Sequence, residues 1–128
     1  MKKALLVFAG IIIFALIAFL CFSASVKKSL AKIENAEIDM SLVQNGTYTG
    51  HSELGPVVVD VAVLVEDHKI KSVNLVHHNC GLGHPAEVIV EQMAAQNTYD
   101  VDAVSGATVS SNVIKNAVNK ALAEAAKQ

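Results

Sequence analysis

The sequence has no arginine and no tryptophan, and it has only two cysteines. A nucleic-acid binder normally shows a basic surplus and Arg side chains that contact phosphates. This chain has a formal net charge of −2, so we expect no nucleic-acid partner. Two cysteines are too few for a disulfide framework or a four-thiolate metal site. Hydrophobic residues make up 52% of the chain and charged residues 17%, a composition that excludes intrinsic disorder.

Aromatic residues are scarce outside the N-terminal segment. All four Phe lie within the first 22 residues, which leaves Tyr48 and Tyr99 as the aromatics of the remaining chain. Two Tyr are too few for a platform on which nucleic-acid bases stack.

The N-terminal segment has no charged residue between Lys3 and Lys27, an uncharged run of 23 residues. As a helix this run would measure about 34 Å, enough to cross a hydrocarbon core of about 30 Å. We therefore predict a transmembrane anchor over residues 1–26. A cleaved signal peptide is the alternative, because Ser23-Ala24-Ser25 offers small residues for cleavage. The apolar stretch of a signal peptide is usually shorter, about 7–15 residues.

The orientation in the membrane depends on a nearly balanced lysine count. Lys2 and Lys3 precede the apolar run, and Lys27, Lys28 and Lys32 follow it. An N-terminal anchor most commonly exports the domain that follows it. We therefore expect a single-pass protein of the cell membrane with its soluble domain on the extracytoplasmic side.

The segment after the anchor, residues 27–41, is charged and has few apolar positions, so we predict a short helical stalk. The folded domain is expected over residues 42–128, which contain five Lys against nine acidic residues. Within it, Val alternates with other residues from Val57 to Val65, the period of a strand with one buried face. A shorter strand around 47–49 precedes it and a strand over 70–77 follows. Turns are indicated at Asn45-Gly46, Gly55-Pro56 and Asp67-His68.

The second half of the domain has helical patterns. Pro85 and Glu87 are typical of a first helical turn, and this helix is expected to end near Asn97. Residues 101–104 are expected to be extended. Apolar residues then recur at helical spacing through residues 110–126. The order predicts an α+β domain, an antiparallel β-sheet with two packed helices, preceded by one N-terminal transmembrane helix.

The strongest chemical motif is DAVSGATVSS, residues 102–111, where a Gly turn leads into the last helix. Such a turn suits a phosphate, because the unpaired N–H groups and partial positive charge of a helix N-terminus stabilise an anion. Gly106 lets the backbone approach closely, and the neighbouring hydroxyls can donate hydrogen bonds. The alternative is that Ser and Thr only cap the helix and bind no ligand.

A second cluster holds the residues His77, His78, Cys80 and His84. Imidazole and thiolate could bind a soft transition metal. However, His77 and His78 should point to opposite faces of a strand, and the cluster has no paired C-x-x-C or H-x-x-x-H spacing. We therefore assign no metal; a loop that lines a ligand, or plain surface histidines, are the alternatives. The sequence also has no G-x-S-x-G motif of a hydrolase.

DAVSGATVSS followed by an amphipathic helix resembles the signature of the FMN-binding domain family. That domain occurs in flavinylated subunits of sodium-pumping NADH:quinone reductases and of Rnf-type ferredoxin:NAD complexes, and in small membrane or surface flavoproteins. The resemblance begins at Asn45-Gly46-Thr47-Tyr48-Thr49-Gly50, runs through the hairpin and through His78 to Glu87, and ends at the motif. The chain departs from the family's pattern at the hairpin turn, where many members have Asp-Gly and this chain has Asp67-His68.

The resemblance implies FMN as the cofactor, attached by a flavin transferase through a phosphoester bond to Thr108. Asp102 matches the acidic residue at the start of the family's motif, and Ser105, Gly106 and Ala107 match its middle. Ser110 and Ser111 are further candidate contacts to the cofactor. Part of the wall around the flavin ring is expected from the loop that holds His78, Gly81, Leu82 and Gly83.

Together these patterns predict a membrane-anchored, extracytoplasmic electron-transfer flavoprotein, a carrier more than a free-standing enzyme. Its electron donor and acceptor would be separate proteins or a quinone. Two alternatives remain: a subunit of a reductase that binds FMN without a covalent bond, and a flavin-free metal-binding or interaction module.

Overall fold

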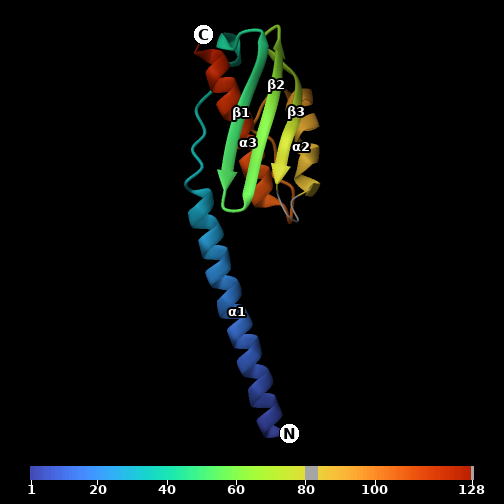
Figure 1. Ribbon diagram of the computed structural model, residues 1–128. Coiled ribbons are helices and arrows are strands. Elements are labelled where there is room, and N and C mark those ends of the chain that lie inside the picture. The colour runs from blue at the N-terminus through green and yellow to red at the C-terminus, as the bar shows by residue number, and fades with distance from the viewer. Residues whose placement is uncertain (80–83, 128) are drawn as a thin grey trace. The chain divides into compact units, whose positions relative to one another are not determined.

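The computed structural model describes residues 1–79 and 84–127. The chain forms two compact units, Met1–Lys32 and Ile33–Gln128. The first is built around α1, Lys2–Leu30, the blue helix of Figure 1. This helix is long and apolar enough to span a membrane, as predicted, and a signal sequence would share these features.

The second unit contains a three-stranded antiparallel sheet with the order β1-β2-β3. Its strands are β1, Gly46–Leu54; β2, Val57–Glu66; and β3, Lys69–Asn79. Buried and less buried side chains alternate along β2, so that the five Val residues at its odd-numbered positions, 57 to 65, all face the core. The α+β class and the hairpin predicted from this alternation are confirmed.

The tight turn between β2 and β3 has a left-handed backbone at two consecutive residues, Asp67 (φ 53°) and His68 (φ 59°). Two-residue hairpin loops favour such geometry, because its twist matches that of the strands. The imidazole Nδ1 of His68 lies 2.8 Å from the carbonyl oxygen of Val43. The side chain of His68 thus ties the turn to the segment before β1.

Two α-helices cover one face of the sheet (Figure 1). A 3-10 turn, η2, spans His84–Val88 and leads into α2, Ile89–Gln96, which packs against β3. Asn97 ends α2 with a left-handed φ of 53°, and its side-chain oxygen accepts a hydrogen bond from the backbone N–H of Ile70. The last helix, α3, spans Thr108–Ala126 and packs against β1 and β2. The two predicted packed helices are therefore confirmed.

Two local predictions are wrong. Residues 101–104 form no strand, and this segment runs as irregular backbone in which Val101 is buried. The helical form predicted for residues 27–41 ends at Leu30. Beyond it, residues 33–39 form no helix, and a short 3-10 turn, η1, spans Met40–Leu42.

Residues 33–39 belong to the folded unit, and two buried amides of α3 hold them there. The side chain of Asn119 accepts a hydrogen bond from the N–H of Ala36 at 2.8 Å and donates one to its carbonyl at 2.7 Å. Asn116 donates to the carbonyl of Glu34 at 2.9 Å. We call residues 33–39 the clasp segment. It pairs with α3, which a stalk acting only as a spacer would not do.

Candidate flavin site

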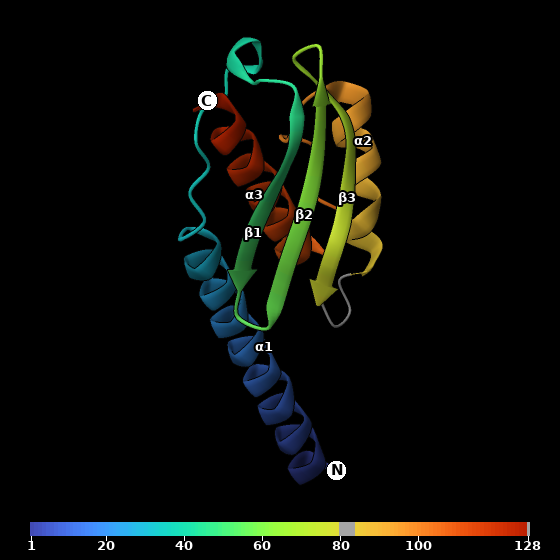
Figure 2. The same cartoon turned by 45° about the horizontal axis from the view of Figure 1, so that its top comes forward.

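The candidate site lies at one end of the domain. There β3 ends, η2 begins and α3 begins, and Figure 2 shows these three features together at the lower end of the sheet. Contacts between η2 and α3 join the two sequence regions singled out above. The fold therefore brings the 102–111 motif and the His78–Glu87 region to one end of the same unit.

A four-residue turn, Val104–Ala107, positions the start of α3. The N–H of Ala107 donates to the carbonyl of Val104 at 3.0 Å. Gly106 has φ +81°, the left-handed value that the third residue of a type II turn requires. A Cβ on Gly106 would meet no atom within 4 Å. Among the described residues the positive φ is therefore what favours Gly here. The close approach of this backbone to a phosphate stays a prediction.

Ser111 braces this turn from within the protein. Its buried hydroxyl accepts a hydrogen bond from the N–H of Val104 at 3.0 Å and donates one to the carbonyl of Ala107 at 2.7 Å. Ser110 and Ala107 are buried as well. The Ser111 hydroxyl thus serves the backbone, and contact of Ser110 or Ser111 with a cofactor stays a prediction.

Among the residues that the structure describes, none caps the N-terminus of α3 with its side chain. Its N-cap residue is Ala107, which has no side-chain hydrogen bond to offer. The first helical bond runs from the N–H of Ser111 to Ala107 at 2.9 Å. The N–H groups of Thr108, Val109 and Ser110 therefore have no partner in the helix itself. Capping by the motif's hydroxyls, the ligand-free alternative, is not what this helix shows.

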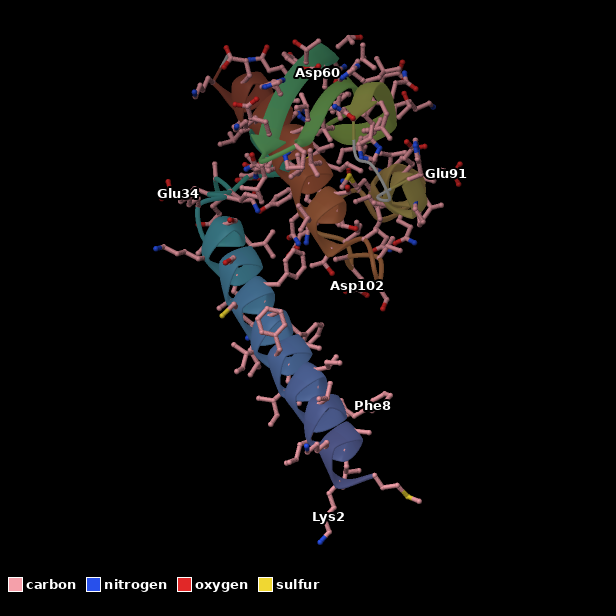
Figure 3. The ribbon with its side chains drawn as sticks, turned by 60° about the horizontal axis from the view of Figure 1, so that its bottom comes forward. Lys2, Phe8, Glu34, Asp60, Glu91 and Asp102 are labelled. Carbon is pink, nitrogen blue, oxygen red and sulfur yellow. The ribbon has the colours of Figure 1, made fainter. Side chains whose placement is uncertain are left out.

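Three polar residues of the motif are exposed: Asp102, Ser105 and Thr108. Thr108 is the first residue of the 19-residue helix. Figure 3 shows Asp102 on the loop at this end of the domain, with its side chain directed outward. The predicted acceptor and the predicted acidic residue are thus accessible to a large partner molecule.

A second acid in this loop is paired. The carboxylate of Asp100 lies 2.9 Å from the ammonium group of Lys115, which projects from α3. The side chain of Lys115 is only 14% exposed, so this pair holds the loop before α3 against the helix. Nothing local in the sequence indicates this pair, because its partners are fifteen residues apart along the chain.

A cluster of three side chains lies at the same end of the domain as the 102–111 motif. Its members are His78, His84 and Glu87. The Nδ1 atom of His78 lies 2.8 Å from Oε1 of Glu87, and the Nδ1 atom of His84 lies 3.1 Å from the same oxygen. Hydrogen bonds from His78 and then His84 hold the pKa of Glu87 below its ordinary value of 4.5. Glu87 therefore remains an anion at neutral pH.

The two adjacent histidines point to opposite sides of β3, as predicted. His77 is exposed, whereas the side chain of His78 is only 3% exposed. Gly81, Leu82 and Gly83, which we expected beside the flavin, lie outside the described residues, as does Cys80 of the candidate metal cluster. Glu87 was expected only to favour a helix N-terminus, and its role as the common partner of two imidazoles was missed. The spacing of three residues between His84 and Glu87 was the available signal.

The comparison with known protein families identifies the domain. A family model described as the FMN-binding domain matches residues 54–123, which is more than half of the chain and includes both the His78–Glu87 region and the 102–111 motif. No curated protein matches the chain. On the strength of the family match, this protein belongs to the FMN-binding domain family, and FMN is its cofactor.

Proposed function

We propose that this protein is a membrane-anchored electron carrier that holds FMN covalently, through a phosphoester bond to the hydroxyl of Thr108. The observation that carries the proposal is the position of Thr108. It is exposed, it is the first residue of α3, and the helix start before it has no side-chain cap. A phosphate bound there would be an anion at the positive end of a 19-residue helix.

The residues around Thr108 fit a phosphate group. The free N–H groups of the first helical turn can donate to its oxygens. Gly106 has open space where a side chain would be, so it leaves room beside the hydroxyl. Ser111 and the Asp100–Lys115 pair keep the preceding loop in place, which fixes the direction in which Thr108 points.

With this attachment, the cofactor and the protein have separate roles. Bound FMN supplies the oxidation–reduction chemistry, and attachment through its phosphate leaves the ring free for that chemistry. Thr108 tethers the group, and the start of α3 stabilises its charge. The exposed carboxylate of Asp102 adds negative charge to this end of the domain and disfavours further negative charge near it.

A carrier of this kind would need an enzyme that attaches FMN, an electron donor and an electron acceptor. A flavin transferase would make the bond to Thr108, and the exposure of the motif supports access by such an enzyme. The electron donor and acceptor would be separate proteins or a quinone. Helix α1 would hold the carrier at the membrane, with the flavin domain on the extracytoplasmic side.

Intact mass spectrometry tests the attachment. Full-length protein co-expressed with a flavin transferase should gain the mass of one FMN less one water. Thr108→Ala should gain none, and Thr108→Ser should retain part of the modification because it keeps a hydroxyl. Thr49→Ala is a matched control, since Thr49 is an exposed threonine on β1.

Two results would contradict the proposal. An unchanged adduct on Thr108→Ala would place the bond elsewhere. Yellow fluorescence that leaves the chain on denaturation, with no mass adduct, would favour a subunit that binds FMN without a covalent bond.

A further inference from the structure

The cluster of His78, His84 and Glu87 has the composition of a metal site. Each residue offers one ligand atom, and the three atoms all lie within 4.8 Å of one another. Two imidazoles and one carboxylate are a ligand set that zinc proteins use with a fourth position open to water. This arrangement lies outside the 102–111 motif, and the proposed attachment of FMN does not require it.

The separations within the cluster are close to those around a bound metal. Ligand atoms about 2.0–2.1 Å from a tetrahedral zinc ion lie about 3.3 Å from one another. The two Nδ1 atoms are now 2.8 and 3.1 Å from Oε1 of Glu87. Side-chain shifts of a few tenths of an ångström would therefore open the cluster around an ion. No change in the backbone of η2 is needed.

His78 is the buried member of the cluster. Its side chain is 3% exposed, and its Nε2 atom is buried without a partner among the described residues. With Nδ1 hydrogen-bonded to Glu87, a neutral ring leaves a lone pair unpaired there, and a charged ring leaves an N–H unpaired. Either arrangement leaves a buried polar atom of His78 unpaired among the described residues, with or without an ion on the Nδ1 side of the ring.

The three ligands differ in exposure, and this difference gives the site an open side. His84 is 71% exposed and Glu87 is 42% exposed, so an ion can reach the cluster from solvent. His78 at the end of β3 provides the fixed, buried ligand. His84 and Glu87 come from η2, so an ion would join the end of the sheet to the beginning of the helical half.

We propose that His78, His84 and Glu87 form a binding site for a first-row divalent cation of the zinc type. The ion takes the Nδ1 lone pairs of the two imidazoles and one carboxylate oxygen, and the proton of each ring then lies on Nε2. For His78 the Nε2 atom then has no partner among the described residues, as is already the case without the ion, so binding adds no further unpaired group. The ion stabilises the connection between β3 and η2.

Zinc titration of the full-length protein in detergent tests this site. After treatment with a chelator, the wild type should bind one Zn²⁺ per chain in competition with a chromophoric zinc indicator. His84→Ala and Glu87→Gln should each weaken binding by more than about tenfold, the loss that removal of even an outer-shell partner can cause. Zn²⁺ should also raise the melting temperature of the wild type and not that of His84→Ala.

Two histidine variants are the controls. His51 lies 2.6 Å from Asp60 on the sheet, so His51→Ala removes an imidazole that is also paired with a carboxylate. His77→Ala removes the exposed neighbour of His78. Both should bind Zn²⁺ as the wild type does. Because His84 is exposed, His84→Ala should fold, which circular dichroism would verify.

Absence of stoichiometric binding in the wild type, or equal binding by His84→Ala and Glu87→Gln, would overturn the proposal. Loss of binding in His51→Ala would move the site to the open sheet. The titration needs no flavin, so none of these results bears on Thr108.

Discussion

Gly50 and Gly106 need to be glycine for different physical reasons. A Cβ on Gly50 would overlap the carbonyl oxygen of Ala117, because β1 and α3 approach each other closely at this point. A Cβ on Gly106 would meet nothing, but its φ of +81° is unfavourable for other residues. One glycine therefore permits the packing of a helix on the sheet, and the other permits the turn that aims Thr108.

These reasons predict different costs of substitution. Gly106→Ala should lower the free energy of unfolding by about 1–2 kcal/mol, the cost of a left-handed backbone with a side chain. Gly50→Ala should cost about 3 kcal/mol or more, because β1 must move away from α3. Gly55→Ala is a control for Gly106, since Gly55 also has a positive φ and open space. Denaturant unfolding followed by circular dichroism measures all three, and equal losses for Gly50→Ala and Gly106→Ala would contradict the packing argument.

Residue roles were predictable where the signal was local in sequence. The turn glycine at 106 could be identified because a Gly before a helix is a local pattern. The bracing role of Ser111 could not, because a hydroxyl in a helical start is equally compatible with a cap, a ligand contact or a bond back to the turn. The carboxylate of Glu87 likewise gained His78 as a partner only when β3 and η2 came together.

At the scale of elements, the clasp segment and α3 form a unit that joins the start of the domain to the proposed flavin helix. Ile33 and Ile38 pack against the hydrophobic core, and the hydroxyl of Tyr99 lies 3.5 Å from the carbonyl of Ala36. Asn119 pairs with both backbone groups of the same Ala36. The buried amide of Asn119 thus bonds to the Ala36 N–H and carbonyl as a neighbouring strand would, and it satisfies backbone groups that would otherwise be unpaired.

Loss of this amide should loosen the clasp. Asn119→Ala removes two hydrogen bonds and leaves partly buried backbone groups of Ala36 unpaired, so it should lower the free energy of unfolding by about 2 kcal/mol. Asn112→Ala is the matched control, because Asn112 bonds only to the carbonyl of Thr108 one turn earlier in the same helix. It should cost about 0.5 kcal/mol. Protease sensitivity near Ala36 should rise in Asn119→Ala alone, and an equal response of both variants would argue against the clasp.

Elements could be predicted where apolar residues recur along the sequence with the period of one buried face. They could not be predicted where the packing partner is distant in the sequence. The period of two along β2 and the helical spacing in α3 follow from a single buried face, which the sequence displays directly. The clasp segment has only scattered apolar residues, so nothing local indicates that it packs on α3. Residues 101–104 have an extended pattern without a neighbouring strand, and extended backbone without ladder hydrogen bonds is a connection.

At the scale of the whole molecule, the proposed membrane anchor leads to the expectation that the flavin domain lies on the extracytoplasmic side. Lysines at both ends of α1 nearly balance, with Lys2 and Lys3 before the apolar run and Lys27, Lys28 and Lys32 after it. Because the charge rule gives little preference, the expected export rests on the position of the span at the N-terminus. An electron carrier placed outside the cytoplasm would exchange electrons with partners there or with the membrane.

Labelling of a single surface cysteine measures this orientation directly. Lys69 is exposed at the β2–β3 turn, so Lys69→Cys in a Cys21→Ser, Cys80→Ser background presents one thiol on the domain. A membrane-impermeant thiol reagent should label it in intact cells stripped of outer barriers, to the same extent as in lysed cells. The Cys21→Ser, Cys80→Ser protein without the new cysteine should stay unlabelled in both. Labelling of Lys69→Cys only after lysis would place the domain in the cytoplasm, and the lysines after α1 would then have determined the topology.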